Sequence, residues 1–221
     1  MTSAAHRYPS DVAFTPTVKA MQQRLGSRAA YARMESEHGW RTVISSSLKD
    51  FIEAQTSVFL ATANAEGQPY IQHRGGPAGF LRVLDEHTLA FADFSGNRQY
   101  ITLGNLADNP HAHLFVIDYA RRRRVKIWGT ARAVDDPELI AKLMPEDYEA
   151  QPERAIVFTV EALDMNCPQH IPQRFDAAEV EAALSARDTR IEALEAEAAR
   201  RETRVRQLEE EVARLREQDA A

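Results

Sequence analysis

The chain has 221 residues, of which 44% are hydrophobic and 27% are charged, and this balance predicts a folded protein rather than a disordered one. Its net charge of −6 excludes the strongly basic field that gathers nucleic acid. No apolar run is long enough to cross a membrane, residues 1–10 lack the apolar stretch of a secretory signal, and a single cysteine cannot form an intramolecular disulfide. We therefore expect a cytoplasmic protein.

Charge and composition predict three segments along the chain. They are an N-terminal helical extension at 1–46, a principal domain at 47–175 and a C-terminal coiled coil at 176–221. The last segment carries 13 acidic and 8 basic side chains, so its net charge of −5 leaves the remainder nearly neutral. In the extension, Thr15 and Pro16 are typical of a helix start, and the interruption at Gly26-Ser27 allows either one helix or a helical pair over residues 15–37.

Short runs rich in β-branched and aromatic residues dominate the principal domain. They predict seven strands, at 58–63, 69–74, 80–84, 88–94, 113–119, 125–134 and 155–162. Asn64 to Gly67 has the composition of a tight hairpin turn, and residues 85–87 form a similarly short connection, so we expect antiparallel pairing of the meander type. The fold class is therefore mainly β, a small barrel with flanking helices.

Three short helices are expected around this barrel. One starts at Ser47 and leads directly into the first strand. A second runs from Asn97 to Asp108 and packs across a barrel end. A third runs from Pro137 to Met144, behind an acidic pair that is typical of a helix start.

Apolar residues recur in the tail at alternating intervals of four and three from Val180 to Leu215, which predicts a coiled coil. One heptad phase places Leu184, Ile191, Ala198, Val205 and Val212 at position a, with leucine at three of the six d positions. This pattern, and mostly opposite charges across positions g and e, favour a parallel two-stranded coil. Arginines at two d positions, 187 and 201, keep open the alternative of a single helix folded back on its own barrel.

The segment from Phe91 to Gln99 is a candidate phosphate site, because a strand there breaks at Ser95-Gly96 and runs into a helix. A helix start offers free N–H groups and a positive dipole end, and Arg98 adds a permanent charge. An arginine that is merely solvated in a first helical turn is the alternative.

Two further polar clusters could meet a ligand. In the run from Gln72 to Gly76, alternation places Gln72 and Arg74 on one strand face and His73 on the other. Residues 121–124 are four consecutive arginines, typical of a solvated turn, but Arg124 and Lys126 share a strand face that could reach an anion.

Other site types find little support in the sequence. His111 and His113 lack a third metal ligand nearby, and Cys167 near His170 lacks the third group of a nucleophilic triad, so we expect packing roles for them. No metal site is predicted. The phosphate loop of nucleotide hydrolases and the glycine fingerprint of Rossmann domains are both missing.

In their order along the chain, these pieces resemble the flavin-binding split barrels of the pyridoxamine 5′-phosphate oxidase type. The resemblance covers roughly residues 47–165. Its motifs are Gly67-Gln68-Pro69, Gln72-His73-Arg74-Gly75-Gly76-Pro77, Ser95-Gly96-Asn97-Arg98-Gln99, Asn109-Pro110-His111-Ala112-His113-Leu114 and Arg124-Val125-Lys126-Ile127-Trp128-Gly129. They are most similar to a branch described as predicted flavin-nucleotide-binding proteins.

The resemblance implies a homodimer that holds FMN in a groove at the subunit interface. The implied cofactor-binding residues are Gln72, His73, Arg74, Asp93, Ser95, Asn97, Arg98, Gln99, Arg124 and Lys126. Arg98 matches the phosphate-binding arginine of the family, whereas Gln99 and Asp93 stand where lysine and threonine are common. A cation such as Arg124 or Lys126 near the pyrimidine edge would stabilise reduced flavin.

The C-terminal tryptophan and arginine pattern with which the true oxidases bind their substrate is missing, so we do not expect oxidation of pyridoxamine phosphate. We expect an FMN-dependent oxidoreductase with another small-molecule substrate and no nucleic-acid or membrane partner. The alternatives are a non-catalytic flavin-binding or flavin-sensing dimer whose coil recruits a partner, the same barrel holding haem or a deazaflavin, and an interaction module with an empty barrel.

Overall fold

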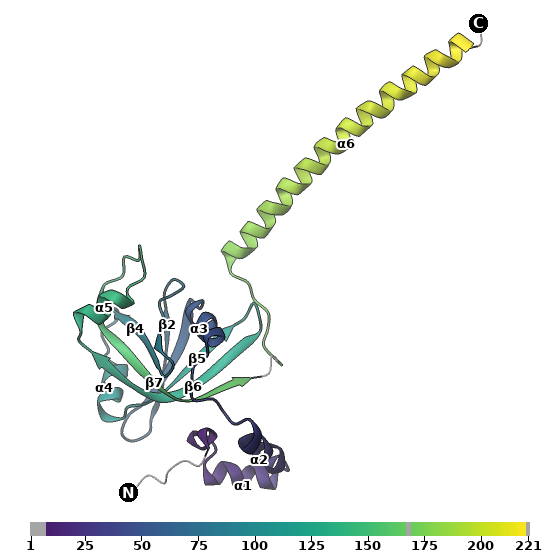
Figure 1. Cartoon of the computed structure of the whole chain (residues 1–221). Coiled ribbons are helices and arrows are strands. Elements are labelled where there is room, and N and C mark those ends of the chain that lie inside the picture. Colours follow the sequence, from purple (N-terminus) through teal and green to yellow (C-terminus); the bar gives the residue numbers. More distant parts are fainter. Residues whose placement is uncertain (1–7, 167–168, 220–221) are drawn as a thin grey trace. The chain divides into compact units, whose positions relative to one another are not determined.

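The computed structural model describes residues 8–166 and 169–219, and the chain forms two compact units, residues 1–172 and 173–221 (Figure 1). The helices are η1 (Pro9–Val12), α1 (Pro16–Arg24), α2 (Arg28–Glu37), α3 (Ser46–Glu53), α4 (Ile101–Asp108), α5 (Pro137–Leu143) and α6 (Ala177–Asp219). The strands are β1 (Ser57–Ala63), β2 (Pro69–Gly75), β3 (Arg82–Asp85), β4 (Thr88–Phe94), β5 (His111–Asp118), β6 (Arg123–Val134) and β7 (Pro152–Asn166). Within the described residues, every helix is too short or too polar to span a bilayer.

The seven strands form one antiparallel sheet in the order β2-β1-β5-β6-β7-β4-β3, which confirms the predicted mainly-β class. The expected meander is incomplete, because β1 pairs with β5 and β4 pairs with β7. Helix α4 explains the difference: it follows β4, contacts β1, β2 and β6, and delivers the chain to β5, which lies between β1 and β6. The β3–β4 hairpin is thereby left to pair with β7.

The larger core cluster lies on one face of the curved sheet, and a smaller one packs between α5 and the other face of β4 and β7. Alternate residues of β1, β5 and β6 are buried, as the period of two along a strand requires. Helix α3 adds an apolar face, and it begins at Ser46, one residue before the predicted start. Its contribution to the core is Leu48, Phe51 and Ile52. At α5, the Asp136 side chain accepts hydrogen bonds from the backbone N–H groups of Glu138 and Leu139, so the predicted cap is confirmed.

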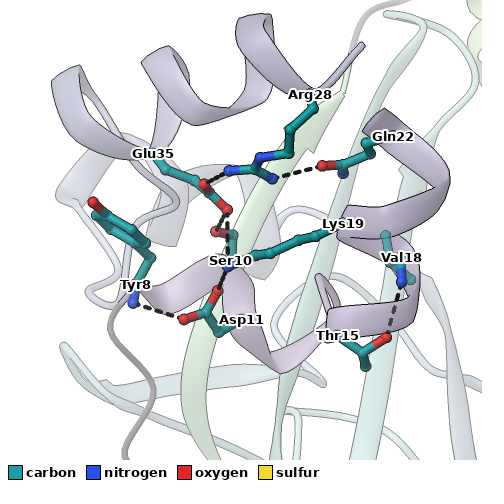
Figure 2. Close-up of polar contacts among 9 residues, drawn as sticks. All are labelled: Tyr8, Ser10, Asp11, Thr15, Val18, Lys19, Gln22, Arg28 and Glu35. Carbon is teal, nitrogen blue, oxygen red and sulfur yellow. Dashed lines mark hydrogen bonds and ion pairs between the residues drawn. The ribbon is translucent and has the colours of Figure 1, made fainter. Parts of the chain in front are cut away.

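The N-terminal extension is a helical pair, α1 and α2, held together by buried charges (Figure 2). The Glu35 side chain is 1% exposed and pairs with Arg28. Its carboxylate also accepts a hydrogen bond from the Ser10 hydroxyl at 3.2 Å and lies 3.7 Å from Lys19 Nζ. Lys19 in turn contacts Asp11 at 2.5 Å. A buried carboxylate is tolerated only when it is paired in this way.

The extension docks on the outer face of the sheet, the face opposite the core. Trp40 stacks on Trp128 of β6 with ring centroids 4.6 Å apart. The backbone N–H of Leu163 donates to the carbonyl of Arg41 at 2.7 Å. His113 of β5 packs edge-on against the same Trp128 at 4.7 Å. Burial, and secondarily the charge of Lys126, lowers the pKa of His113 from 6.5 to about 4.

We predict that Gly129→Ala strongly destabilises the sheet. Gly129 lies at the register shift between β6 and β7, where an added Cβ would lie 1.9 Å from the carbonyl oxygen of Thr159. The expected loss in the free energy of unfolding is about 3 kcal/mol, measured by urea denaturation. Gly104→Ala is the control: its Cβ would meet nothing within 4 Å, and alanine in the middle of α4 should stabilise by about 0.5–1 kcal/mol. Equal changes in the free energy of unfolding for the two variants would contradict the close contact between Gly129 and Thr159 at the register shift.

We also predict acid destabilisation through His113. In the unfolded chain His113 takes up a proton below about pH 6.5, whereas in the folded protein it does so only near pH 4. The free energy of unfolding therefore falls as the pH falls through this window. The His113 contribution should decrease by about 2 kcal/mol between pH 7 and pH 5. His113→Phe should remove this component in urea titrations, whereas Phe115→Leu, on the same strand face, should retain it. An unchanged pH dependence in His113→Phe would refute the assignment.

Candidate functional site

Two arginines and an aspartate connect β2, at one end of the sheet, with β4 and β7 near its other end. Asp93 of β4 is buried, and its carboxylate pairs with Arg74 of β2 at 2.6 Å and with Arg154 of β7 at 3.3 Å. Strand β2 is the last strand at one end of the sheet and is not hydrogen-bonded to β4. The ion pair from Arg74 to Asp93 therefore bridges the split in the barrel.

A hollow with a cavity volume of about 190 Å³ lies beside this bridge. Its walls come from β2, the end of β4, the following loop, the first turn of α4 and the start of β7. The polar side chains that line it are Tyr70, Gln72, Arg74, Asp93, Asn97, Arg98, Gln99, Tyr100, Thr102, Glu153 and Arg154. Segments far apart in the sequence thus combine into one polar concavity.

The loop before α4 differs from the prediction. Helix α4 starts at Ile101, not at Asn97, because Arg98 and Tyr100 have φ angles of 56° and 55°. Such left-handed conformations are unfavourable for these residue types and end any helical path through them. Arg98 therefore lies in the loop rather than in a first helical turn, with its Nε donating to the Tyr100 hydroxyl at 2.9 Å.

Two hydrogen bonds fix α4 against the barrel. Thr102 donates to the side-chain oxygen of Gln72 in β2, and Asn105 donates to Thr62 in β1, both at 2.9 Å. Residues 101–103, the first turn of the helix, line the hollow. The N–H groups of a first helical turn have no intrahelical acceptor, so the positive end of α4 lies at the wall of the hollow.

The charges of the hollow are three guanidinium groups against two carboxylates. Asp93 offsets part of the positive charge of Arg74 and Arg154. Glu153 contacts Arg154 at 3.0 Å and Arg98 at 3.9 Å. The hydrogen bond to the Tyr100 hydroxyl, with a smaller contribution from Glu153, raises the pKa of Arg98 above its ordinary value. Arg98 therefore remains charged at every working pH, and its side chain is 68% exposed and available to a ligand.

The structure brings six of the ten predicted site residues together. Gln72, Arg74, Asp93, Asn97, Arg98 and Gln99 all line the hollow. Ser95 is next to it but is not part of the lining, and its N–H donates to the carbonyl of Gln151. His73 is on the other face of β2, as alternation predicted, and packs edge-on against Phe59.

Arg124 and Lys126 do not reach the hollow of their own chain. Both lie on the outer face of β6, because the alternating residues Val125 and Ile127 are buried in the core. Lys126 is 3.5 Å from Asp164 of β7. Cys167, for which we expected a packing role, lies outside the described residues.

Sequence reasoning missed Arg154 and Glu153. The signal that could have revealed them is register: Arg154 lies directly opposite Asp93 in the β4–β7 ladder. That pairing joins residues 61 positions apart and cannot be read from local alternation. The predicted last strand also began at residue 155, which left both side chains in a loop.

The donor set fits a phosphate group. Arg74 Nε is buried and, among the described residues, has no hydrogen-bond partner. An unpaired buried donor is unfavourable, and the guanidinium of Arg74 keeps this unused donor next to the hollow. Arg98 and the start of α4 offer further donors on the same side. The cavity has room for a phosphate but not for a three-ring flavin, whose ring system would have to lie outside it.

The chain is similar to one protein family and to solved structures of several bacterial proteins. The family model described as pyridoxamine 5′-phosphate oxidase matches residues 44–167, and no curated protein matches the chain. Among solved structures, Group A Streptococcus HupZ has 22% identity and a TM-score of 0.47, with 60% of this chain and 99% of that chain covered. An FMN-binding protein from Syntrophomonas wolfei has 9% identity and a TM-score of 0.42, with 68% and 97% covered. HutZ, the haem storage protein from Vibrio cholerae, has 18% identity and a TM-score of 0.39, with 55% and 94% covered.

The family match spans more than half of the chain and coincides with the antiparallel barrel and its arginine-lined hollow. The chain therefore belongs to the pyridoxamine 5′-phosphate oxidase family, as a split barrel followed by a long C-terminal helix.

Proposed function

We propose that this protein binds FMN and is an FMN-dependent oxidoreductase. The observation that carries the proposal is a hollow lined by three arginines in a member of this family; one of the three, Arg74, has a buried Nε without a partner among the described residues. In the proposed complex, Arg74, Arg98 and the first turn of α4 hold the phosphate. Asp93 fixes the orientation of Arg74 and Arg154.

The proposed flavin site uses two protomers. A second buried nitrogen without a partner among the described residues is Nε of Arg124, on the outer face of β6. Because this face and the hollow lie on opposite sides of the sheet, a single chain cannot place both against one flavin. In a homodimer, one protomer would supply the hollow, and its partner would supply the outer face with the counterparts of Arg124 and Lys126.

When bound, FMN would supply transfer of a hydride or of single electrons. The residues of the chain would bind the FMN, orient it and exclude water from it. A positive charge from Arg124 or Lys126 near the flavin would favour the reduced, anionic form. The hollow contains carboxylates and tyrosines, but the described geometry does not require any of them as an acid or base.

We predict that Arg98→Asn weakens FMN binding about tenfold to a hundredfold, because it removes a charge-assisted contact to phosphate. Asparagine tolerates the left-handed backbone found at residue 98, so the loop should keep its shape. The measurement is flavin absorbance of the purified protein after adding excess FMN and desalting, followed by titration of the apoprotein.

Two further variants sharpen this test. Arg98→Lys should recover part of the affinity, because it restores the charge without the bidentate geometry. Arg132→Gln, which removes an exposed arginine of β6, should bind FMN like the parent protein. A colourless protein that does not bind added FMN would refute the proposal. An absorption spectrum of haem would instead favour the haem-binding alternative.

Catalysis and sensing can be separated in the flavin-loaded protein. Anaerobic mixing with a reduced nicotinamide should bleach the flavin absorbance, and admitted oxygen should restore it. A flavin that stays oxidised with this and other small reductants would favour the non-catalytic dimer.

We further propose that α6 pairs with α6 of a second protomer. Of its 43 residues, the large apolar side chains that are exposed all occupy heptad positions a or d: Val180, Leu184, Ile191, Leu194, Val205, Leu208, Val212 and Leu215. Such a stripe is unfavourable in water unless a partner covers it. Opposite charges at Arg190 and Glu195, and at Arg204 and Glu209, favour a parallel pair.

We predict that Ile191→Cys crosslinks two chains when residue 167 is changed to serine. In a parallel, in-register coil the two copies of position 191 face each other, so mild oxidation should give a dimer on a non-reducing gel. Arg200→Cys, on the outer face of the helix, is the control and should crosslink poorly. Equal crosslinking of both variants would contradict the register, and monomers of the full chain in solution would contradict pairing.

A further inference from the structure

A second cavity, of about 640 Å³, lies between the N-terminal extension and the outer face of the sheet. Its walls include Phe14 and Tyr31 of the extension, Trp40 and Arg41 of the link to the barrel, and Trp128 of β6. No residue that lines it also lines the arginine-rich hollow. Its volume is in the range of small-molecule sites.

The aromatic walls are ordered by mutual contacts. Trp40 stacks on Trp128 at 4.6 Å, Phe14 lies 5.1 Å from Trp40, and Tyr31 meets Phe14 edge-on at 5.3 Å. Four rings from three parts of the chain therefore form one preorganised surface. Stacked and edge-on pairs of this kind fix ring orientation, which lowers the entropic cost of binding a further ring.

The cavity nevertheless keeps apolar surface in contact with water. Tyr31 is 42% exposed and Met165 is 47% exposed, although both line a concave site. A pocket that served only to dock the extension would be filled by its own side chains, as protein interiors normally are. The remaining space and the exposed apolar lining indicate room for a ligand.

The charged groups of the cavity favour an anion. Arg41 and Lys126 contribute two positive charges, and Asp164 contributes one negative charge. Lys126 and Asp164 contact each other at 3.5 Å, whereas the Arg41 side chain has no ion-pair or hydrogen-bond partner among the described residues. The guanidinium is thus available at the rim of an aromatic pocket, an arrangement that suits a carboxylate on a flat ring.

We propose that this cavity binds a planar aromatic carboxylate, with its rings against Trp40, Trp128 and Tyr31 and its carboxylate on Arg41. The site stands on its own geometry and does not depend on flavin binding. Its location places the ligand where the extension and the barrel meet, so occupancy would also stabilise the docking of the extension.

The test uses the two tryptophans of the chain, both of which line the cavity. The full-length protein is titrated with 2-naphthoate, its neutral analogue 2-naphthamide and the non-aromatic cyclohexanecarboxylate. Tryptophan emission and calorimetry are the readouts. We expect saturable binding of 2-naphthoate that is at least about tenfold tighter than that of either analogue. No saturable binding of 2-naphthoate, or equal affinity for all three compounds, would overturn the proposal.

Variants identify the site. Arg41→Gln and Tyr31→Ala should each weaken 2-naphthoate binding about tenfold. Arg132→Gln and Tyr148→Ala are matched controls, since Arg132 is exposed on β6 and Tyr148 packs edge-on against Phe94 elsewhere. The controls should bind like the parent protein, and losses of equal size in all four variants would overturn the assignment. Because Arg41 is exposed, its substitution should leave the thermal midpoint unchanged.

Flavin binding is separated from this site by two further titrations. In the Arg98→Asn protein, 2-naphthoate should bind with unchanged affinity, because Arg98 does not line this cavity. In the parent protein with excess FMN, 2-naphthoate should still bind, because Arg41 and the aromatic walls of the cavity are not among the residues proposed to meet the flavin; Lys126 is the one cavity residue that the proposed dimer also places near the flavin. Displacement of 2-naphthoate by FMN would place the flavin ring in this cavity and overturn the proposal of a separate site. A protein that refuses FMN but binds 2-naphthoate would refute the proposed function alone.

Discussion

The buried carboxylate of Asp93 holds the barrel and its candidate site together. It receives Arg74 from β2 and Arg154 from β7, so one side chain connects strands that the hydrogen-bonded sheet leaves apart. Removing one partner from such a cluster typically costs about 3–5 kcal/mol, because the other charges stay buried without compensation. The same constraint shapes the site: Asp93 holds the terminal nitrogen of Arg74 beside the hollow, while the buried Nε of Arg74 has no hydrogen-bond partner among the described residues.

The two faces of β6 determine what a single chain can complete. Val125 and Ile127 point into the core, which places Arg124, Lys126 and Trp128 on the outer face. There the extension covers Trp128 with Trp40, while Arg124 Nε remains buried and, within the described part of the chain, unpaired. A phosphate would need only the hollow of one chain, whereas a flavin that also met Arg124 would require a second copy of the sheet.

Much of this fold was accessible from the sequence because its local signals agree. Alternation and β-branched composition predicted all seven strands to within a few residues, and Asp136 before Pro137 predicted the start of α5. The sheet order was not predicted, since it depends on α4 carrying the chain past β1 to β5. The prediction that Arg98 lies in a helical turn was wrong for a related reason. Its backbone is left-handed where the loop closes onto α4, against the helical preference of the segment.

The same contrast explains why the second cavity had no signature in the sequence. Phe14, Trp40 and Trp128 are separate aromatic residues in a helical extension, a linker and a strand, and each alone is typical of packing. Only the docking of the extension, through the Leu163–Arg41 backbone bond and the tryptophan stack, turns them into one surface. On the same face, His113 lies opposite Trp128 in the β5–β6 ladder, and burial together with the charge of Lys126 lowers its pKa, so the imidazole stays neutral. A charged imidazole at that position would be partly buried and close to the cation Lys126, so protonation of His113 is unfavourable in the folded protein.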